Sequence, residues 1–501
     1  MKIAWSKLDT SHLSPNDEAL LRRKVALDLR DQSNYKGARE VMLPLWKHVG
    51  EGPEIKGLDP SVAAEVLLCV GILTSWIGSK EGIEKSQETA KDLISKAITI
   101  FESLGDLLKV AESRAEIAFC YFHEGGLDEA RIMLTEVLQK LSPQGNTKAR
   151  ALIKLAAVEW TASRYDVAHE ILTNNAALFK RITNHITLGS YHNELAVVLR
   201  HLAEWEPLNR EKHLQQAIKE FKTAGNHFRL GKNKVFGACV KNNVGLILLN
   251  LGRFTAAHKN LEEARRLSVS TRNKVQTAVI DESRAQVFIA ERKYKAAEGV
   301  ARHAVRVLDK SGHQAHLADA LITHGIALAR LGKSEQALVS LQRAFETAQQ
   351  AGALNKAGMA ALTIIEELDE APTESLSFAF DRASEWVPSP QSEELWPRLN
   401  AAARKVLARL HGEKGTKVDS AALSIRPPFK LHEEMHRLEE MLIRNTLSEV
   451  NGRITPAAKR MGVSYQGLAY IIQNRHPKLL DERTPVRTRT RKKDMQSQPA
   501  S

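Results

Sequence analysis

The sequence predicts an all-α protein. Apolar residues recur at helical spacing from Ala19 to about Val387, and the alternation typical of β-strands is absent. Small residues also return every 40 positions through part of this region, which indicates stacked structural repeats. A length of 501 residues, with 43% apolar and 26% charged side chains, is typical of a globular chain of two to four domains or a repeat array. We therefore expect a superhelical array of helical hairpins followed by a small domain.

The same composition argues against several other classes. No apolar run approaches the roughly 18 residues that cross a bilayer, and MKIAWSKLDT lacks the apolar stretch of an export signal. The three cysteines, Cys69, Cys120 and Cys239, are too few and too far apart for a disulfide framework or a metal site. We expect them to be small core residues. These observations favour a cytoplasmic protein with no membrane partner.

The repeat is clearest in its second helix. One small residue is followed seven positions later by another, and a large apolar residue lies between them in most copies. The first small residues are Ala90, Ala130, Ala217, Ala257, Ala297 and Ala337, and Ala301 is the exception at the large position. Twelve residues before the first small residue comes another, on a helix that precedes a short turn: Ala118, Ala156, Gly245, Ala285 and Gly325. The turns read LGRF, ERKY and LGKS, so each unit is predicted to be a helical hairpin.

This pattern resembles the tetratricopeptide repeat, which has a small residue on its first helix and an aromatic residue, such as Phe254, Tyr294 or Tyr165, near the start of its second. The resemblance covers roughly residues 15 to 387 in about nine hairpins, with degenerate ones at Ala38, Ala168 and Ala379. It departs from the usual 34-residue period, and insertions are expected at EWEPLNREK and WIGSKEGIE. A long coiled coil would lack these turns. The resemblance implies a groove for a protein or peptide; a rigid spacer or a dimerisation surface is the alternative.

Four segments follow from these patterns. Residues 1–387 are predicted to form the array, and residues 388–429 a linker with one amphipathic helix, because PSPQ and the Gly- and Pro-containing stretch before Lys430 interrupt the periodicity. Residues 430–480 are predicted to form a separate domain, and residues 481–501 a basic disordered tail.

The positive charge is concentrated at the C-terminus. The chain carries +13 overall, and the last 51 residues contribute +8 of it, from eleven basic and three acidic groups. A local positive end suggests a polyanionic partner, and by itself it fits DNA, RNA or an acidic membrane surface.

Three short helices are predicted in the domain at 430–480. The first places Leu431, Met435, Leu438 and Leu442 on one apolar seam and ends at Asn451-Gly452. The second has Thr455 as its N-cap and ends at Gly462, and the third opens at Ser464 with Leu468, Ile471 and Ile472 facing inward. Two capped helices joined by so short a turn indicate a helix-turn-helix.

The run EVNGRITPAAKRMGVSYQGLAYII resembles the Fis-type helix-turn-helix at the C-termini of bacterial enhancer-binding activators. The match is carried by Asn451, Gly452, Thr455, Ala457, Ala458, Gly462, Val463, Ser464 and Leu468. The resemblance implies that the helix opening at Ser464 enters the major groove of double-stranded DNA. We also expect a homodimer through the helix that carries Leu431, Met435, Leu438 and Leu442.

The predicted recognition helix differs from the family in one respect, because it lacks basic residues. Gln466 can pair with an adenine edge, and Tyr465 and Tyr470 can contact phosphate or a thymine methyl group. Most phosphate contacts are therefore expected from the tail, unless it is only a solubilising segment. The predicted DNA-binding residues are Thr455, Ser464, Tyr465, Gln466, Tyr470, Arg475, Lys478, Arg483, Arg487, Arg489, Arg491, Lys492 and Lys493.

Three motifs look catalytic or metal-binding but are not assigned such a role. His432 to His436 reads H-E-x-x-H, yet no third zinc ligand follows, and we expect both histidines to flank a packing or dimer face. Gly332-Lys333-Ser334 falls in a repeat turn instead of after a strand, and His313 and His316 have no third metal ligand. We therefore predict no enzyme activity, no catalytic or metal-binding residue and no cofactor.

These observations favour a bacterial-type transcriptional regulator that binds specific DNA sequences, and whose array receives a protein or peptide signal. Two alternatives remain open. In the first, the chain is a scaffold for protein–protein interaction whose helix-turn-helix no longer distinguishes DNA sequences. In the second, the chain binds RNA through the basic tail alone.

Overall fold

The structure is a computed structural model of the whole chain, and it describes residues 10, 12–141, 145–369, 371–386, 396–413, 431–450, 452–461 and 465–480. All regular secondary structure within these ranges is helical, which confirms the all-α prediction. The chain divides into two compact units, Met1–Lys414 and Gly415–Ser501, here called the array unit and the C-terminal unit.

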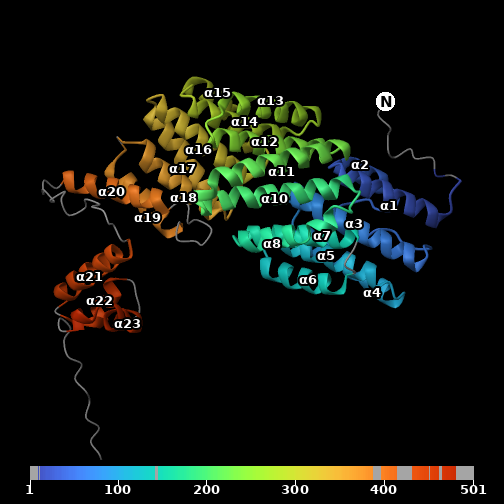
Figure 1. Cartoon of the computed structure of the whole chain (residues 1–501), viewed down its shortest axis with the longest axis horizontal. Coiled ribbons are helices and arrows are strands. Elements are labelled where there is room, and N and C mark those ends of the chain that lie inside the picture. The colour runs from blue at the N-terminus through green and yellow to red at the C-terminus, as the bar shows by residue number, and fades with distance from the viewer. Residues whose placement is uncertain are drawn as a thin grey trace, which may run out of the picture. The chain divides into compact units, whose positions relative to one another are not determined.

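The array unit is a succession of antiparallel helical hairpins, each stacked on the next (Figure 1). Across the described part of this unit there are nine, as the sequence predicts. They are α1 (Pro15–Asp31) with α2 (Tyr35–Met42), α3 (Pro60–Glu81) with α4 (Ser86–Ser103), α5 (Leu107–Glu124) with α6 (Leu127–Lys140), α7 (Asn146–Thr161) with α8 (Tyr165–Asn174), α10 (His185–Trp205) with α11 (Arg210–Leu230), α12 (Lys234–Asn250) with α13 (Phe254–Ser270), α14 (Lys274–Ala290) with α15 (Tyr294–Asp309), α16 (Gln314–Arg330) with α17 (Ser334–Gln350), and α18 (Leu354–Glu367) with α19 (Thr373–Trp386). The fold is a superhelical array of tetratricopeptide-like hairpins.

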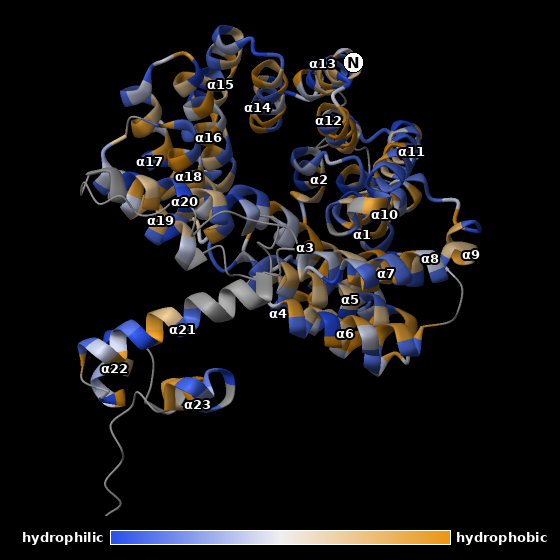
Figure 2. Cartoon of the chain, turned by 60° about the vertical axis from the view of Figure 1, so that its left-hand side comes forward, coloured by the Kyte–Doolittle hydropathy of each residue, from blue (hydrophilic) through white to orange (hydrophobic). Residues whose placement is uncertain are grey.

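The predicted repeat positions form the core of the array. From Ala217 to Ala344, the small residues at the repeat positions of the second helices have no exposed surface, and neither do the large residues Phe221, Leu261 and Leu341. Helices carry their polar and apolar residues on different faces (Figure 2). Burying these apolar faces requires a neighbouring hairpin, because one hairpin has no second layer to cover it.

Glycine allows the two helices of a hairpin to approach closely. A Cβ atom on Gly325 would lie 2.6 Å from Cγ of Leu341, and one on Gly245 would lie 2.7 Å from Leu261. The intervening repeat has Ala285 at the glycine position and Ala301 at the leucine position, both fully buried. Where alanine replaces glycine on the first helix, alanine also replaces leucine on the second, and this makes room for the added methyl group. This compensation explains the exception at Ala301.

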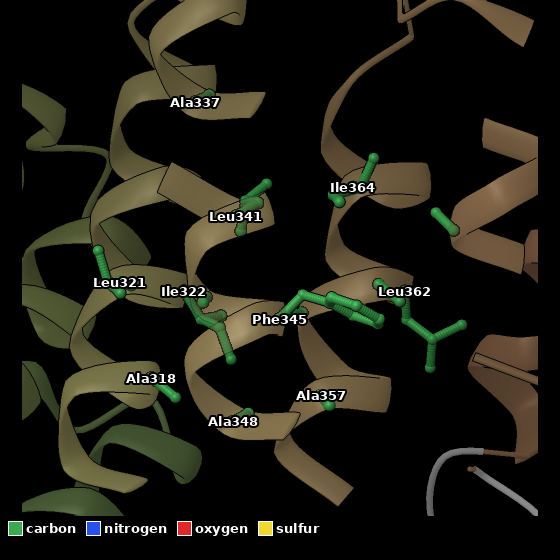
Figure 3. Packing of buried hydrophobic residues seen from close by; sticks show 14 of the residues in the cluster. Ala318, Leu321, Ile322, Ala337, Leu341, Phe345, Ala348, Ala357, Leu362 and Ile364 are labelled. Atoms are coloured by element: carbon green, nitrogen blue, oxygen red, sulfur yellow. The ribbon is translucent and has the colours of Figure 1, made fainter. Parts of the chain in front are cut away.

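The core continues from one hairpin to the next. In Figure 3, Phe345 of α17 points toward Leu362 of α18, and Ile322 of α16 lies on the other side of α17. Ile322, Phe345 and Leu362 belong to one buried cluster, which also includes residues of α19 and α20. The array is therefore held together by apolar packing across its hairpin boundaries.

The turns within hairpins lie where the sequence predicts them. Gly252 and Gly332 have φ values of 68° and 74°, in the left-handed region that glycine adopts without strain. Arg292 occupies the same region with φ of 60° in the turn ERKY. These residues end the first helix of each hairpin and reverse the chain direction.

Both predicted insertions lengthen helices. Glu204–Lys212 spans the end of α10, a 3₁₀ turn at Pro207–Asn209 and the start of α11, and both helices contain 21 residues. WIGSKEGIE lies at the end of the 22-residue helix α3 and in the turn that follows it. One further short helix, α9 (Ala176–Phe179), lies between α8 and α10.

Helix α3 corrects the prediction that no apolar run is long enough to cross a membrane. Among the described helices, only α3 is long and apolar enough to cross a membrane. However, 83% of its most apolar 18-residue stretch is buried inside the protein. Its one early charge, Glu65, pairs with Arg23 at 2.6 Å and with Lys109 at 2.9 Å. The helix is apolar all round because α1, α2, α4 and α5 cover it.

Two further predictions differ from the structure. Helix α20 (Trp396–Glu413), in the segment assigned to the linker, packs on α18 and α19 through Leu399, Ala402 and Val406, so the array continues past residue 387. Cys69 and Cys120 are buried as expected, whereas Cys239 is exposed on α12 and accepts a hydrogen bond from Nε2 of Gln276 at 3.1 Å. Cys239 lies outside the apolar contact face of its helix.

Candidate functional site

The C-terminal unit has a small apolar core of its own. It contains α21 (Leu431–Glu449), α22 (Ile454–Arg460), α23 (Tyr465–Arg475) and a 3₁₀ turn at Pro477–Leu480. Nine buried residues from all four elements make up the core: Ile443, Leu447, Val450, Ile454, Ala457, Ala458, Leu468, Ile472 and Leu479. The predicted inward residues Leu468 and Ile472 are fully buried, and Ile471 packs against them. This core fixes α22 against α23.

The first helix ends where the sequence predicts. Gly452 has φ of 71°, and its N–H donates to the Leu447 carbonyl at 2.8 Å. This hydrogen bond closes the last turn of α21 and redirects the chain into α22. Asn451 itself lies outside the described residues.

The start of α22 differs by two residues from the prediction. The N-cap is Arg453, with no capping side chain, and Thr455 lies exposed in the first turn of the helix. The core explains the shift, because Ile454 is buried and belongs to the helix. Thr455 is therefore available to solvent and is not occupied with capping the helix.

Three arginines in this unit pair with acidic residues of α21, and one of them, Arg444, does so within that helix, at 2.7 Å from Glu440. Arg475 Nη1 lies 3.3 Å from Oε1 of Glu439, and Arg460 Nη1 lies 2.9 Å from Oε2 of Glu449. The buried His476 bonds the other oxygen of Glu439 at 2.9 Å. Glu439 thus holds the end of α23 against α21.

The other described basic side chains project outward. Lys459 and Lys478 are exposed and lie on α22 and on the 3₁₀ turn. Arg453 is also exposed, although its Nε donates to the Val450 carbonyl at 3.4 Å. These three exposed cations lie at the start of α22, on α22 and in the 3₁₀ turn that follows α23.

Several predicted DNA-binding residues, or their side chains, lie outside the described set. Tyr465, Gln466 and Tyr470 lie on α23, but their side chains are outside the described set. Ser464 and the tail residues Arg483, Arg487, Arg489, Arg491, Lys492 and Lys493 are outside it as well.

Helix α21 carries apolar side chains on a second face. Ile443 and Leu447 point into the core, whereas Met441 and Leu442 are 49% and 54% exposed. Adjacent positions on a helix differ by about 100°, so Leu442 cannot share the direction of Ile443. Leu442 belongs to the seam predicted for a homodimer; the side chains of Leu431, Met435 and Leu438 lie outside the described set.

The array unit contains a cluster of buried charges that no sequence pattern indicated. Lys154 on α7 lies 2.7 Å from Glu116 on α5, and Nζ also donates to the Ala115 carbonyl at 3.2 Å. Arg30 on α1 pairs with Asp31 at 2.6 Å, and Arg150 lies 3.7 Å from Glu116. Burial would raise the pKa of Glu116, but Lys154, Arg150 and Arg30 outweigh it and lower that pKa to about 2.

The motifs that look catalytic have ordinary structural positions where they can be seen. Gly332 and Lys333 lie in the turn between α16 and α17, and Ser334 begins α17. The rings of His313 and His316 stack with centroids 6.4 Å apart. The side chains of His432 and His436 are outside the described residues. Among the described residues, no group of three or more His, Cys, Asp and Glu side chains is arranged to hold a metal ion.

No family model matches the chain. No curated protein matches it either. Among solved structures, similarity is found to a signal transduction ATPase with numerous domains and a tetratricopeptide repeat sensor from Pyrococcus horikoshii, with a TM-score of 0.49 and 14% identity. The match covers 78% of this chain and 66% of that one, slightly less than two thirds of the ATPase.

Two further structures belong to Rap proteins. The apo form of RapI matches with a TM-score of 0.47 and 13% identity, over 70% of this chain and 100% of that one. A Rap protein complexed with competence and sporulation factor matches with a TM-score of 0.45 and 13% identity, over 68% and 99% of the two chains.

Proposed function

We propose that the chain is a transcriptional regulator that binds specific sequences of double-stranded DNA through its C-terminal unit, and that its array receives a protein or peptide signal. The observation that carries this proposal is the core formed by Ile443–Leu479, which fixes two short helices, α22 and α23, at a four-residue connection. Such a pair presents its second helix to the major groove in helix-turn-helix proteins. The likeness of this segment to the Fis-type motif supports the same assignment.

The charges around the motif suit a phosphate backbone. Lys459, Lys478 and Arg453 are exposed around α22 and α23, and Thr455 is exposed at the start of α22. Six more basic residues follow between Arg483 and Lys493 in the sequence. In the proposal these groups hold the unit on phosphates, while Tyr465, Gln466 and Tyr470 discriminate between bases.

A homodimer through α21 is part of the proposal. Met441 and Leu442 expose large apolar surfaces on a helix whose other face is already packed. A second copy of α21 would cover them and would present two reading helices about one turn of DNA apart. In this proposal the protein acts by binding, in the cytoplasm, and not as an enzyme.

A selection of random DNA duplexes by the intact chain tests the proposal. We expect a consensus motif with two related half-sites, and we expect Gln466→Ala and Tyr465→Ala to weaken binding to that motif more than binding to unrelated duplexes. The matched control is Gln473→Ala, an exposed glutamine on the same helix one turn from its end. A selection that returned no consensus would favour the scaffold, and binding of RNA that depended only on residues 481–501 would favour the RNA alternative.

A further inference from the structure

A cavity of about 270 Å³ lies on the inner side of the array, between hairpins that are far apart in the sequence. Its walls come from α1, α2, α3, α5, α7, α10, α11 and α12. Asn233, the N-cap of α12, forms hydrogen bonds with Asp31 and Ser33 at the turn between α1 and α2. The first hairpins therefore face the fifth and sixth across the cavity. Ligand pockets in proteins commonly measure about 300–1,000 Å³, so this cavity suits a small ligand or the end of a chain.

Aromatic rings form the apolar part of the cavity wall. Tyr35 and Trp76 stack with centroids 6.3 Å apart, and Trp76 lies 5.4 Å from Phe119. Phe228 and Phe236 lie 5.1 Å from each other and also line the cavity. All except Phe228 keep some accessible surface. A flat apolar group could stack on these rings, which gains more than burial of the same area against aliphatic side chains.

One cation at the cavity has unused hydrogen-bonding capacity. Arg150 lines the cavity with a side chain that is 34% exposed, and its closest carboxylate, on Glu116, is 3.7 Å away. That distance is too long for a hydrogen bond, so the guanidinium donors remain available. The neighbouring cations are engaged, because Lys154 pairs with Glu116 at 2.7 Å and Arg30 pairs with Asp31 at 2.6 Å.

The remaining carboxyl group at the cavity is held by uncharged donors. Glu194 accepts hydrogen bonds from Nε1 of Trp160 at 2.8 Å and from Nδ2 of Asn193 at 3.1 Å. No basic side chain pairs with it among the ion pairs of the described residues. Burial raises the pKa of Glu194 above its usual value, against the effect of these hydrogen bonds. An aromatic cavity can also hold a cation, which an ionised Glu194 would attract, whereas the permanent charge of Arg150 favours an anion.

We propose that this cavity binds a flat aromatic group that carries one carboxylate, with the ring against the accessible surfaces of Trp76, Phe119 and Phe236 and the carboxylate on Arg150. Planar guanidinium donors match a carboxylate in a two-point geometry. A free aromatic acid and the C-terminal aromatic residue of a peptide share this chemistry. The inference deepens the proposed signal-receiving role of the array, but it depends only on the array unit.

Calorimetric titration of the intact chain without DNA tests this site. The probes are 2-naphthoate, the uncharged 2-naphthamide and the cationic 2-naphthylmethylammonium. We expect naphthoate to bind at least about tenfold more tightly than naphthamide, since a charge-assisted hydrogen bond contributes about 1.5–3 kcal/mol. Equal binding of naphthoate and naphthamide, tighter binding of the cation, or no heat with any probe at millimolar concentration would overturn the proposal.

Two variants locate the carboxylate. Arg150→Gln should remove most of the preference for naphthoate over naphthamide while leaving naphthamide binding nearly unchanged. The matched control is Arg266→Gln, an exposed arginine on α13 that does not line the cavity. Glu194→Gln should strengthen naphthoate binding severalfold at pH 8 and reduce its pH dependence, because the carboxylate that repels the probe is gone. If Arg150→Gln and Arg266→Gln behave alike, the assignment of Arg150 is wrong.

A fourth probe distinguishes the two natural sources of the ligand. It is a tripeptide, acetyl-Gly-Gly-Trp, with either a free or an amidated C-terminus. Preference for the free acid of the peptide over naphthoate would identify a peptide end, whereas preference for naphthoate would identify a small acid; both support the shared chemistry. Because no DNA is present in these titrations, their failure would leave the DNA-binding proposal standing, and failure of DNA binding would leave this site standing.

Discussion

Asn233 joins the sixth hairpin to the first through a hydrogen bond to Asp31, 202 positions earlier in the chain. Nδ2 of Asn233 donates to the Asp31 carbonyl at 2.8 Å and to Oγ of Ser33 at 3.0 Å. The same side chain caps α12, because its Oδ1 accepts from the Phe236 N–H at 2.9 Å. Asn233 is 1% exposed, so these groups have no access to water as an alternative partner. The residue therefore links the first hairpin to the sixth, next to Asp31 and Phe236, which line the aromatic cavity.

Replacing Asn233 by Ser tests this link. Serine still caps α12, but it cannot reach the Asp31 carbonyl, so we expect a loss of about 1–2 kcal/mol in the free energy of unfolding and faster hydrogen exchange in α1 and α2. The matched control is Asn273→Ser, because Asn273 caps α14 in the same way, accepting from Gln276 N–H at 3.0 Å. If both variants lose the same stability and α1–α2 exchange is unchanged, the contact does not hold the two hairpins together.

The close approach of helices at Gly325 gives a second prediction. Gly325→Ala places a methyl group 2.6 Å from Cγ of Leu341, so we expect destabilisation by about 1–3 kcal/mol in denaturant unfolding. Leu341→Ala alone should cost about 2–5 kcal/mol. The double variant should cost less than the sum of the two, because it recreates the Ala285 and Ala301 combination of the preceding repeat.

Gly299 provides the control for this series. It lies within α15, and a Cβ atom there would meet nothing within 4 Å. Gly299→Ala should therefore be neutral or stabilising by up to about 1 kcal/mol, from helix propensity alone. Equal effects at Gly299 and Gly325 would show that close packing against Leu341 is not the cause.

The buried pair of Glu116 and Lys154 gives a third prediction. With the pKa of Glu116 lowered from 4.5 to about 2, its contribution to stability is present above pH 4.5 and is lost as the pH falls toward 2. Glu116→Gln should cost about 3 kcal/mol at pH 7, because Lys154 loses its buried counter-charge. Thermal unfolding from pH 7 to pH 2 should show a flatter dependence for this variant than for the exposed control Glu136→Gln.

Glu282 on α14 is expected to make stability depend on pH in the opposite direction from Glu116. Burial raises its pKa from 4.5 to about 7, although Thr323 and Gln286 both donate to its carboxyl group at 2.6 Å. Its contribution to stability is therefore present below pH 4.5 and is lost as the pH rises through 7. Glu282→Gln should be more stable than the unaltered chain at pH 8, by up to about 3 kcal/mol, and equal to it at pH 4. A constant difference across this range would contradict the assignment.

Local patterns predict the hairpins well, because their determinants are close in sequence. Ala217, Phe221 and Ala224 face one neighbour at helical spacing, and Gly252 marks a turn whose backbone conformation glycine adopts freely. The sequence assigns α20 to the linker because PSPQ interrupts the periodicity before it, whereas its contacts with α18 and α19 depend on tertiary packing.

The inner surface of the array could not be predicted in this way. Glu116 and Lys154 are 38 positions apart on different hairpins, and Asn233 on the sixth hairpin reaches Asp31 on the first. The curvature that brings them together is the sum of small rotations between hairpins, which no single motif specifies. In the C-terminal unit, the apolar pattern located the core, but it did not distinguish the buried Ile443 from the exposed Leu442.

Binding of the intact chain to duplex DNA, measured by fluorescence anisotropy across salt concentrations, tests the central claim most directly. We expect binding at low salt, with log K falling linearly against log salt by about 0.9 per phosphate contacted. Removal of residues 481–501 should reduce both the affinity and this slope, while Gln466→Ala should reduce affinity for the selected motif alone. Failure to bind any duplex at low salt, or binding without salt dependence, would contradict the account.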